Sequence, residues 1–523
     1  MKYLIQIFTC IVLIASVTSC QDEFLEPEPV ASYFQDNYYV TDGQMFEALI
    51  AAYDPLQWAY YNGRWVALPM LGDIKSDNAR AGGANDKDQE GWQQIDDQVN
   101  DPNTLESLAI WKRDYFGVYR SNLVINADYN SEEAEIYKAE ARFLRAWFYF
   151  DLLRTFGPTP VITITEFPPD FKFVRGTREE INNLITGDLR AAYESLPEEW
   201  PSNYKGRATK GAALALLGKV YLYKADWDND NAQDFDSAAY FLNEVKNIGD
   251  KGVYELVPEY EDLWAYGYEN TAESVFEIQH SELSFAGWDG GSGEHIDGNL
   301  MIQLCGIRGL NNHPEYIAGW GFMLPTQELY DAFMPEDSIR RAATIITSDD
   351  LQAVGASWNV SDHNPNDYTG MFQKKYANFT AYQPANGDQN INKDRNIVVI
   401  RYADVLLMLA EAAHRGTNPV GADPYALVDQ VRQRALDHDN DGVFKTAAQL
   451  EGELGSFLDV IWYERRAEFA LEGDRWFDLV RSGRANSALL GPDYGPEDQY
   501  LPCHAQETNA SGGTISTYPE EMN

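Results

Sequence analysis

The densest set of charged side chains lies in the stretch ERRAEFALEGDRWFDLVRSG, which runs from Glu464 to Gly483. Glu464, Glu468 and Glu472 recur every four residues, so a helix places their carboxylates on one face, where like charges repel mildly. Paired carboxylates can serve as the acid and base of a hydrolase. Catalytic carboxylates normally stand in a cleft with few counter-charges, whereas four arginines are interleaved here: Arg465, Arg466, Arg475 and Arg481. We therefore interpret the stretch as structural.

A structural interpretation requires cations from other helices. Guanidinium groups bind carboxylates through two parallel hydrogen bonds, so arginines are the most suitable partners. Four arginines lie in strongly apolar segments and are the predicted donors: Arg142, Arg145, Arg154 and Arg401. The sequence thus predicts a lattice of ion pairs in place of an active site.

Other catalytic signatures are absent from the sequence. The seven histidines are scattered, without the HExxH spacing of zinc hydrolases. The sequence contains no GxSxG nucleophile elbow and no GxxxxGK[ST] or GxGxxG nucleotide-binding motif. We therefore expect neither an enzyme nor a cofactor. A glycosidase needs only two suitably separated carboxylates, and a chain with 82 acidic residues leaves that alternative open.

One segment has the spacing of a metal-binding loop. Asp437, Asp439 and Asp441 alternate before Gly442, as in the first half of a calcium loop. The twelfth position is Ala448, where a bidentate glutamate would be required. A turn rich in Asp and Asn between two helices has the same composition without an ion. A structural calcium ion and an ordinary turn therefore both remain as interpretations.

The elements that must position these groups are mostly helices. The clearest is predicted over residues 132–156, where apolar side chains recur at steps of three and four. Ser131 is its predicted N-cap, and Gly157-Pro158 ends it. Further helices are predicted near residues 43–58, 105–127, 178–195, 209–225, 235–248, 402–415, 424–436 and 456–472. The fold class is predicted to be dominated by α-helices, as a tetratricopeptide-like scaffold of helix pairs.

Residues 251–400 interrupt the helical pattern. Gly, Asn, Trp and Pro crowd together there, with short strand-like segments such as Ser274–Gln279 and Asn396–Ile400. We predict a loop-rich excursion with a few short strands, between an N-terminal helical half (31–250) and a C-terminal helical half (401–523). Binding sites usually lie on loops that a rigid frame carries, so the excursion is the expected place for one.

The composition restricts the class of partner. The chain has 523 residues and a formal net charge of −42. Nucleic-acid binding relies on Lys and Arg that neutralise phosphates, so this charge strongly disfavours nucleic acid, and anionic lipid head groups would be repelled as well. Of the four cysteines, only Cys305 and Cys503 lie in the body of the chain. One disulfide between them is possible, but two distant cysteines more often stay unpaired, which is our expectation.

The N-terminus resembles a secretory leader. One lysine precedes an apolar run from Tyr3 to Val17, which is too short for a comfortable membrane span. The leader ends in a sequence that resembles a bacterial lipobox, where lipid is attached to Cys20; ordinary cleavage beside a coincidental cysteine is the alternative. We predict three parts: a signal peptide (1–19), a lipidated tether (20–30) and a single domain (31–523). The acidic residues after Cys20 resemble a surface-export signal.

The charged stretch also carries a family likeness. It resembles the C-terminal signature of the SusD/RagB family of outer-membrane nutrient-binding lipoproteins, an ERR-x-E-x-x-x-EG-x-RW-x-DL-x-R pattern. The matching residues are Glu464, Arg465, Arg466, Glu468, Glu472, Gly473, Arg475, Trp476, Asp478, Leu479 and Arg481. Further segments are similar to helices of the family in the same order: 141–162, 210–228, 398–416 and 428–436. Only the run after Leu501-Pro502 departs from the family, which is usually richer in proline there.

This resemblance implies a fold and a role. The implied fold is one α-helical domain with four tetratricopeptide-like pairs. The implied role is that of a non-catalytic lipoprotein, anchored by lipid and facing the outside of the outer membrane, that captures oligo- or polysaccharide. It would pass this cargo unchanged to a SusC-like TonB-dependent transporter, which the scaffold would cap as a lid.

Glycan binding makes its own demands on the residues. Sugars present C–H faces to aromatic rings and hydroxyls to planar polar side chains, so exposed rings with Arg, Asn or Asp at their edges are required. The polar loop 72–92 supplies Asp77, Asn78 and Arg80 before Trp92, and few apolar residues surround that tryptophan. We expect these four side chains to contact glycan.

The excursion supplies two more rings. Trp288 and Trp320 are each flanked by glycine, which leaves the faces of their indoles uncovered. We expect both to contact glycan. Other tryptophans lie within apolar patterns and are predicted to belong to the core: Trp58, Trp65, Trp111, Trp147 and Trp476.

Two alternatives belong to other functional classes. A helical-repeat scaffold can also be an adaptor that binds a protein or a peptide, and the glycine-flanked tryptophans favour sugar only modestly over peptide. A surface glycosidase is the second alternative. The sequence favours a neutral glucan over an anionic polysaccharide, because the net charge repels polyanions.

Overall fold

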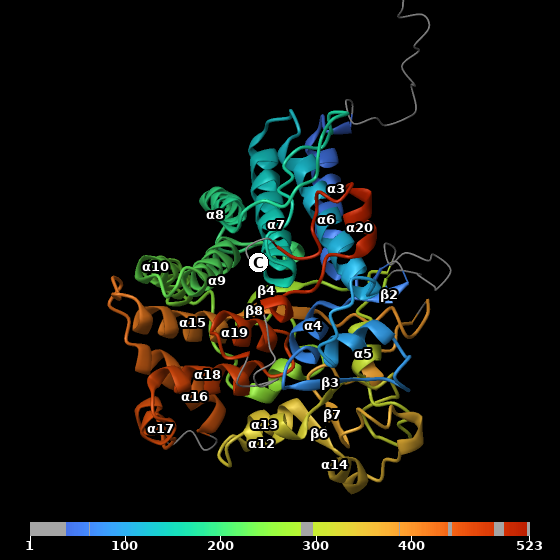
Figure 1. Ribbon diagram of the computed structural model, residues 1–523. Coiled ribbons are helices and arrows are strands. Elements are labelled where there is room, and N and C mark those ends of the chain that lie inside the picture. The colour runs from blue at the N-terminus through green and yellow to red at the C-terminus, as the bar shows by residue number, and fades with distance from the viewer. Residues whose placement is uncertain are drawn as a thin grey trace, which may run out of the picture.

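The protein is described by a computed structural model, which covers residues 38–61, 63–283, 296–385, 387–437, 442–485 and 496–519. Helices dominate, and short strands gather in the part of the chain between α10 and α15 (Figure 1). Within the described residues no helix is sufficiently long and apolar to span a membrane.

Each helix predicted from the sequence is present, within a few residues of the expected bounds. These scaffold helices are α3 (Asp42–Tyr53), α6 (Leu105–Ile125), α7 (Glu132–Phe156), α8 (Arg178–Ser195), α9 (Lys210–Trp227), α10 (Ala232–Gly249), α15 (Tyr402–Arg415), α16 (Pro424–Leu436) and α18 (Phe457–Phe469). Helix α3 is shorter than expected, because Pro55 follows it and the chain continues as a 3-10 turn over Asp54–Gln57.

The caps of α7 are those that the sequence predicts. The hydroxyl of Ser131 accepts a hydrogen bond from the backbone N–H of Ala134 at 2.9 Å. Gly157 follows the last turn with a φ of 68°, a region that glycine enters without steric cost. A Cβ atom at Gly157 would lie 2.5 Å from Cγ of Pro519, so the C-terminal segment also requires glycine here.

The scaffold helices stack in sequence order. Helix α6 packs on α7, α7 on α8, α8 on α9 and α9 on α10. Helix α10 then packs directly on α15, so the stack continues across the excursion without using any of its residues. Small residues permit close contact: a Cβ atom at Gly218 of α9 would lie 2.5 Å from Cγ of Leu242 of α10. This confirms the predicted arrangement of tightly packed helical pairs.

The strands of the excursion pair with one another or with β3 (Ala79–Gly82) of the preceding chain, as antiparallel two-stranded ribbons. These ribbons pair β3 with β5 (Phe322–Pro325), β4 (Ser274–Ile278) with β8 (Ile397–Arg401), and β6 (Ile345–Thr347) with β7 (Met371–Gln373); a hairpin of β1 (Tyr60–Tyr61) and β2 (Arg64–Trp65) precedes them. The two predicted strand segments are thus β4 and β8, which pair with each other.

Short helices connect the ribbons and the scaffold. They are α4 (Leu68–Ile74), α5 (Glu90–Asp96), α11 (Met301–Cys305), α12 (Gln327–Ala332), α13 (Ser338–Thr344), α14 (Ser348–Ala353), α17 (Ala447–Leu454), α19 (Arg475–Arg481) and α20 (Ala505–Ala510). Most carry too few residues for a clear apolar period, which is why the sequence pattern did not predict them.

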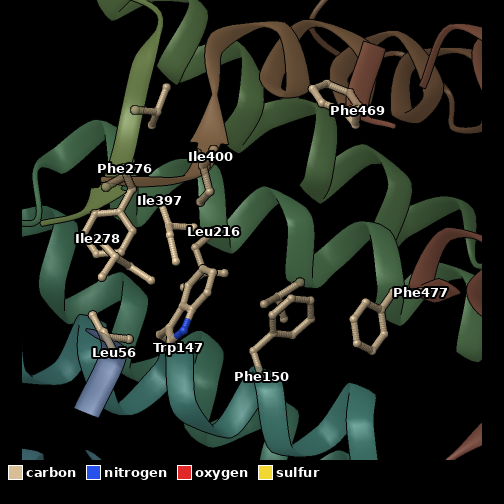
Figure 2. Close-up of a cluster of buried hydrophobic side chains, with 14 of the residues drawn as sticks. Leu56, Trp147, Phe150, Leu216, Phe276, Ile278, Ile397, Ile400, Phe469 and Phe477 are labelled. Atoms are coloured by element: carbon tan, nitrogen blue, oxygen red, sulfur yellow. The ribbon is translucent and has the colours of Figure 1, made fainter. Parts of the chain in front are cut away.

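The ribbon of β4 and β8 joins the excursion to the scaffold. Figure 2 shows Phe276 and Ile397 of this ribbon facing Trp147 of α7 and Leu216 of α9. The ring centroids of Phe276 and Trp147 are 6.0 Å apart. Each such buried side chain stabilises the fold by about 1.5–3 kcal/mol relative to exposure. The excursion is therefore attached through a continuous apolar core.

The two cysteines in the body of the chain are free and buried, as expected. Burial raises the pKa of the Cys503 thiol to about 11, so this thiol stays protonated at neutral pH.

Candidate functional site

The carboxylates of the charged stretch lie inside the protein and are matched by cations. Glu464 and Glu468 of α18 are both 0% exposed. Arg340 of α13 contacts Glu464 at 2.9 Å, and Arg432 of α16 binds the other oxygen of the same carboxylate. We call Glu464, Glu468 and Glu472, with the cations that bind them, the ion-pair lattice.

Glu468 is bound by arginines from three directions. Arg401 contacts it at 2.8 Å, Arg340 at 3.4 Å, and Arg434 forms a third contact. Burial disfavours the charge of Glu468, but these three guanidinium groups outweigh burial and lower its pKa to about 2. A carboxylate that is held ionised and enclosed in this way is unsuited to proton transfer near neutral pH, so the structure supports a structural role.

Of the four arginines predicted to bind the carboxylates of the charged stretch, one is confirmed. Arg401 binds Glu468 and Glu472, and Lys375 binds Glu472 at 2.6 Å. The other three predicted arginines serve different parts of the scaffold: Arg145 binds Asp188, Arg154 binds Asp151 and Asp474, and the charge of Arg142 acts on Asp188. The prediction was wrong for these three because α7 packs mainly on α6 and α8, whereas the cations of the lattice come from α13, α16, β8 and the segment after β7.

Asp77 and Asn78 are buried, so the expectation that they contact glycan is wrong. The carboxylate of Asp77 accepts hydrogen bonds from Nε and Nη2 of Arg475, both at 2.7 Å. Oδ1 of Asn78 accepts from Nε of Arg466 at 3.1 Å. The turn after α4 lies against the segment from Glu464 to Gly483, and its polar side chains accept hydrogen bonds from arginines of that segment. These two residues therefore anchor the fold.

Trp92 is 0% exposed, so the expectation that its ring is open to ligand is also wrong. The segment predicted as a loop contains helix α5, which packs on α4, α6 and β3 and buries the indole among apolar side chains. The indole N–H of Trp92 donates a hydrogen bond to the carbonyl oxygen of Trp65 at 2.9 Å. Trp92 thus supports, from the side of the core, the hairpin that carries Trp65.

Three partly exposed rings lie side by side at this hairpin. The ring centroids of Tyr60 and Trp65 are 4.6 Å apart with an interplanar angle of 40°, and those of Trp65 and Trp320 are 5.2 Å apart at 44°. All three rings pack with one side on the buried core and keep part of their surface accessible. We call Tyr60, Trp65 and Trp320 the aromatic platform.

The platform combines Trp320, which the sequence analysis predicts to bind glycan, with Tyr60 and Trp65, which it does not. Trp320 is partly exposed, as expected for a ring flanked by glycine. Trp65 was predicted to be a core residue, which is wrong, because its hairpin has only two residues in each strand and lies at the edge of the core. The neighbouring aromatic run Trp58-Ala59-Tyr60-Tyr61 carries no signal for this exposure, because its Trp58 and Tyr61 are buried.

The ribbon of β3 and β5 continues from the chain segment that carries Trp320. The backbone N–H of Gly83 donates to the carbonyl oxygen of Gly321, which follows Trp320, at 2.8 Å. Arg80 of β3 has a side chain that is 50% exposed and contacts Asp96 at 3.2 Å. Burial raises the pKa of Asp96 to about 7, although the Ala81 N–H and Arg80 oppose this shift. Arg80 is thus an accessible guanidinium on the ribbon that begins next to Trp320, and guanidinium groups donate to hydroxyls of the kind that sugars present.

The remaining predicted positions lie wholly or partly outside the described residues. Trp288, Cys20, Asp439 and Asp441 fall there. Asp437 is described: its carboxylate is buried and accepts the backbone N–H of Gly442 at 2.9 Å. In the part of the chain that the structure describes, no group of three or more His, Cys, Asp or Glu side chains is placed to hold a metal ion. Calcium binding at this turn stays a prediction.

Two family models match successive parts of the chain. One, described as the SusD family, matches residues 347–512, and the other, described as starch-binding associating with outer membrane, matches residues 23–222. A SusD-like protein of Bacteroides ovatus is 28% identical over 485 residues, which cover 88% of this chain and 79% of that protein. SusD-like protein P2 of Formosa agariphila is 26% identical over 501 residues, which cover 93% and 92%.

Solved structures with names that refer to glycans are similar as well. A laminarin binding SusD-like protein is 28% identical with a TM-score of 0.78, over 92% of this chain and 100% of that one. Surface glycan-binding protein A from Bacteroides thetaiotaomicron in complex with laminarihexaose is 25% identical with a TM-score of 0.78, over 91% and 99%. These similarities extend across both the scaffold and the excursion.

Proposed function

The chain belongs to the SusD family, and from this premise we propose that it captures oligo- or polysaccharide at the cell surface without changing it chemically. In this proposal Cys20 carries the lipid that anchors the protein to the outer face of the outer membrane. A SusC-like TonB-dependent transporter receives the glycan. Relatives that are named as surface glycan-binding proteins support the first part of the proposal.

The observation that carries the proposal is the aromatic platform. Three adjacent, partly exposed rings match the C–H faces of consecutive sugar units, and each stacked ring contributes about 0.5–1.5 kcal/mol beyond burial. With a few hydrogen bonds, the expected binding free energy is about −4 to −8 kcal/mol, which corresponds to millimolar to micromolar affinity. Binding of this strength permits release to a transporter. Trp288 and Arg80 are proposed as further contacts.

A neutral glucan is the proposed ligand. The net charge of −42 repels polyanions, and two structural neighbours carry laminarin or laminarihexaose in their names. Laminarin is therefore the first polysaccharide to test. The absence of catalytic motifs from the sequence supports binding without cleavage, as does the use of the densest carboxylates in the ion-pair lattice.

The test is affinity electrophoresis in gels that contain laminarin, a mixed-linkage glucan, starch or an anionic polysaccharide. The wild-type protein is expected to be retarded by at least one neutral glucan without release of reducing ends. The double variant Trp65→Ala/Trp320→Ala is expected to lose most of that retardation while it stays folded at the temperature of the assay, which thermal unfolding checks. Tyr240→Ala, which removes a half-exposed ring of α10, is the matched control and should behave as wild type.

The other functional classes predict different results. Retardation by no glycan would overturn the proposal and favour an adaptor for protein or peptide. Release of new reducing ends would establish a glycosidase. Full retardation of the double variant would show that the platform is not the binding site.

A further inference from the structure

A pocket of about 550 Å³ lies between the 3-10 turn η4 (Tyr260–Trp264), the loop that ends at Tyr316 and the segment after β7. Its walls include Trp264, Tyr266, Tyr316 and Phe379. None of the residues that line it belongs to the aromatic platform. Its volume is in the range of small-molecule sites, which is about 300–1,000 Å³.

The pocket presents aromatic surface to solvent. Tyr266 is 50% exposed, and its ring meets that of Tyr382 edge-on with centroids 5.0 Å apart. Phe379 is partly exposed and lies between Tyr316, at 4.8 Å, and Tyr382, at 5.7 Å. These rings hold one another in place while Tyr266 and Phe379 keep accessible surface. A sugar ring can stack on such a surface.

Trp264 forms a buried part of the pocket wall. Trp264 is 4% exposed, and its indole N–H is buried with no hydrogen-bond partner among the described residues. Because this N–H has no accessible surface, a sugar in the pocket does not reach it, and Trp264 contributes packing to the wall rather than a hydrogen bond to the ligand.

The wall around Trp264 is held rigidly by the ion-pair lattice. Lys375 lies over the indole face with Nζ at 4.7 Å from the ring centroid, and its Nζ also contacts Glu472 at 2.6 Å. The hydroxyl of Tyr260, at the start of the η4 turn, donates to the carbonyl oxygen of Glu468 at 2.7 Å. The pocket is therefore preformed, which lowers the entropic cost of binding.

Charge selects the class of ligand. Three carboxylates line the pocket, those of Glu261, Asp262 and Glu315, against one lysine, Lys374. Nζ of Lys374 already donates to the carbonyl oxygen of Ala342 at 2.9 Å. The excess of negative charge repels uronic acids and sulfated sugars, whereas carboxylates accept hydrogen bonds from neutral hydroxyls.

We propose that this pocket is a second saccharide-binding site, which takes a short neutral segment of glycan independently of the aromatic platform. The proposal rests on the glycan-binding function but adds a separate place of contact. Two weak sites on one chain bind a long polysaccharide more tightly than either does alone, provided that the polysaccharide can span them. Long glycans are therefore expected to lose more affinity than short ones when the second site is removed.

The experiment compares variants by saturation-transfer NMR with laminarihexaose, cellohexaose and maltohexaose, and by affinity electrophoresis with laminarin. Tyr266→Ala and Glu315→Ala change exposed side chains, so both are expected to fold. The Trp65→Ala/Trp320→Ala variant is expected to keep a reduced hexasaccharide signal, and addition of Tyr266→Ala should abolish it. Tyr266→Ala alone should weaken retardation by laminarin at least threefold, and Tyr240→Ala should not.

The outcomes separate this proposal from the function itself. If the platform variant binds no hexasaccharide while the wild type does, the second site does not exist and the glycan-binding function stands. The same conclusion follows if Tyr266→Ala and Glu315→Ala leave both measurements unchanged. If the wild-type protein binds none of the glycans, both proposals are overturned.

Discussion

The ion-pair lattice and the aromatic platform are opposites in physical terms. The lattice contains the densest charge of the molecule, and its central carboxylates are fully enclosed by cations from distant segments. The platform carries no charge on its rings. Tyr60 and Trp65 lie on a hairpin with two residues in each strand, and Trp320 packs against Trp65 from the segment before β5. The carboxylates, which are the residues best suited to catalysis, therefore stabilise the fold, whereas the proposed binding surface consists of aromatic side chains.

This contrast shows how exposure decides the use of a residue. A buried carboxylate surrounded by arginines cannot exchange protons near neutral pH, although it fixes the relative positions of α13, α16, α18 and β8. A ring at the edge of the core costs little to expose and remains available to a ligand. Variants that disturb the lattice should change stability, and variants of the platform should change binding.

The largest expected effect is that of Glu468→Ala. The substitution leaves Arg401, Arg434 and Arg340 without their shared carboxylate, and breaking a buried ion pair from one side costs about 3–5 kcal/mol. Denaturant unfolding measures the loss in the free energy of unfolding. Glu453→Ala is the matched control, because Glu453 makes a single exposed pair with Lys445 and should change stability by less than about 0.5 kcal/mol. A similarly small effect of Glu468→Ala would contradict the buried lattice.

The next effect is a loss of stability in acid. Burial opposes the charge of Glu411, but Arg481 and Arg415 outweigh it and lower the pKa of Glu411 from 4.5 to about 2. Because the folded-state pKa is the lower one, this contribution to stability is complete above about pH 4.5 and is lost as the pH falls towards 2. At about 1.4 kcal/mol for each pKa unit, the loss is about 3 kcal/mol.

Unfolding curves between pH 2 and 6 measure this slope. The Glu411→Gln variant is expected to be less stable than wild type at pH 6 and to show a shallower decline below pH 4.5. Parallel curves for the two proteins would show that Glu411 is not held ionised by its arginines.

A smaller effect is expected from Trp92→Phe, which links the two regions. The variant removes the indole N–H that binds the carbonyl oxygen of Trp65 and part of a fully buried ring, at a cost of about 2 kcal/mol. Because Trp65 loses its support, retardation by glycan should weaken also. Thermal unfolding and affinity electrophoresis measure the two effects. A variant that loses binding but no stability would place Trp92 in the site, contrary to its burial.

The scaffold could be predicted because its signals are local. The apolar period of α7, its Ser131 cap and its Gly157 end all lie within one segment, and each feature is present in the structure. Short helices such as α5 have fewer residues than two helical periods, so their polar composition suggested a loop. That misassignment caused the error at Trp92. Helix α5 packs against its neighbours and buries the ring, whereas the same ring on a loop would be expected to stay exposed.

The site was only partly predictable because its residues are brought together by tertiary structure. Trp320 was found from its glycine neighbours, which act locally. Trp65 was missed because its exposure depends on where a two-residue hairpin lies relative to the core. The partners of the ion-pair lattice were missed for the same reason: Arg340, Arg432 and Arg434 reach their carboxylates across more than thirty residues of sequence.

The smallest expected effect on stability is that of Arg80→Ala. The side chain of Arg80 is half exposed, and its contact with Asp96 is of the kind that contributes less than about 1 kcal/mol. If Arg80 binds glycan hydroxyls beside the platform, retardation by laminarin should weaken severalfold although the free energy of unfolding hardly changes. Lys251→Ala, which removes an exposed pair with Glu198 on another part of the surface, is the control. Equal retardation of the two variants would restrict the binding surface to the rings, whereas a selective loss for Arg80→Ala would extend it along β3.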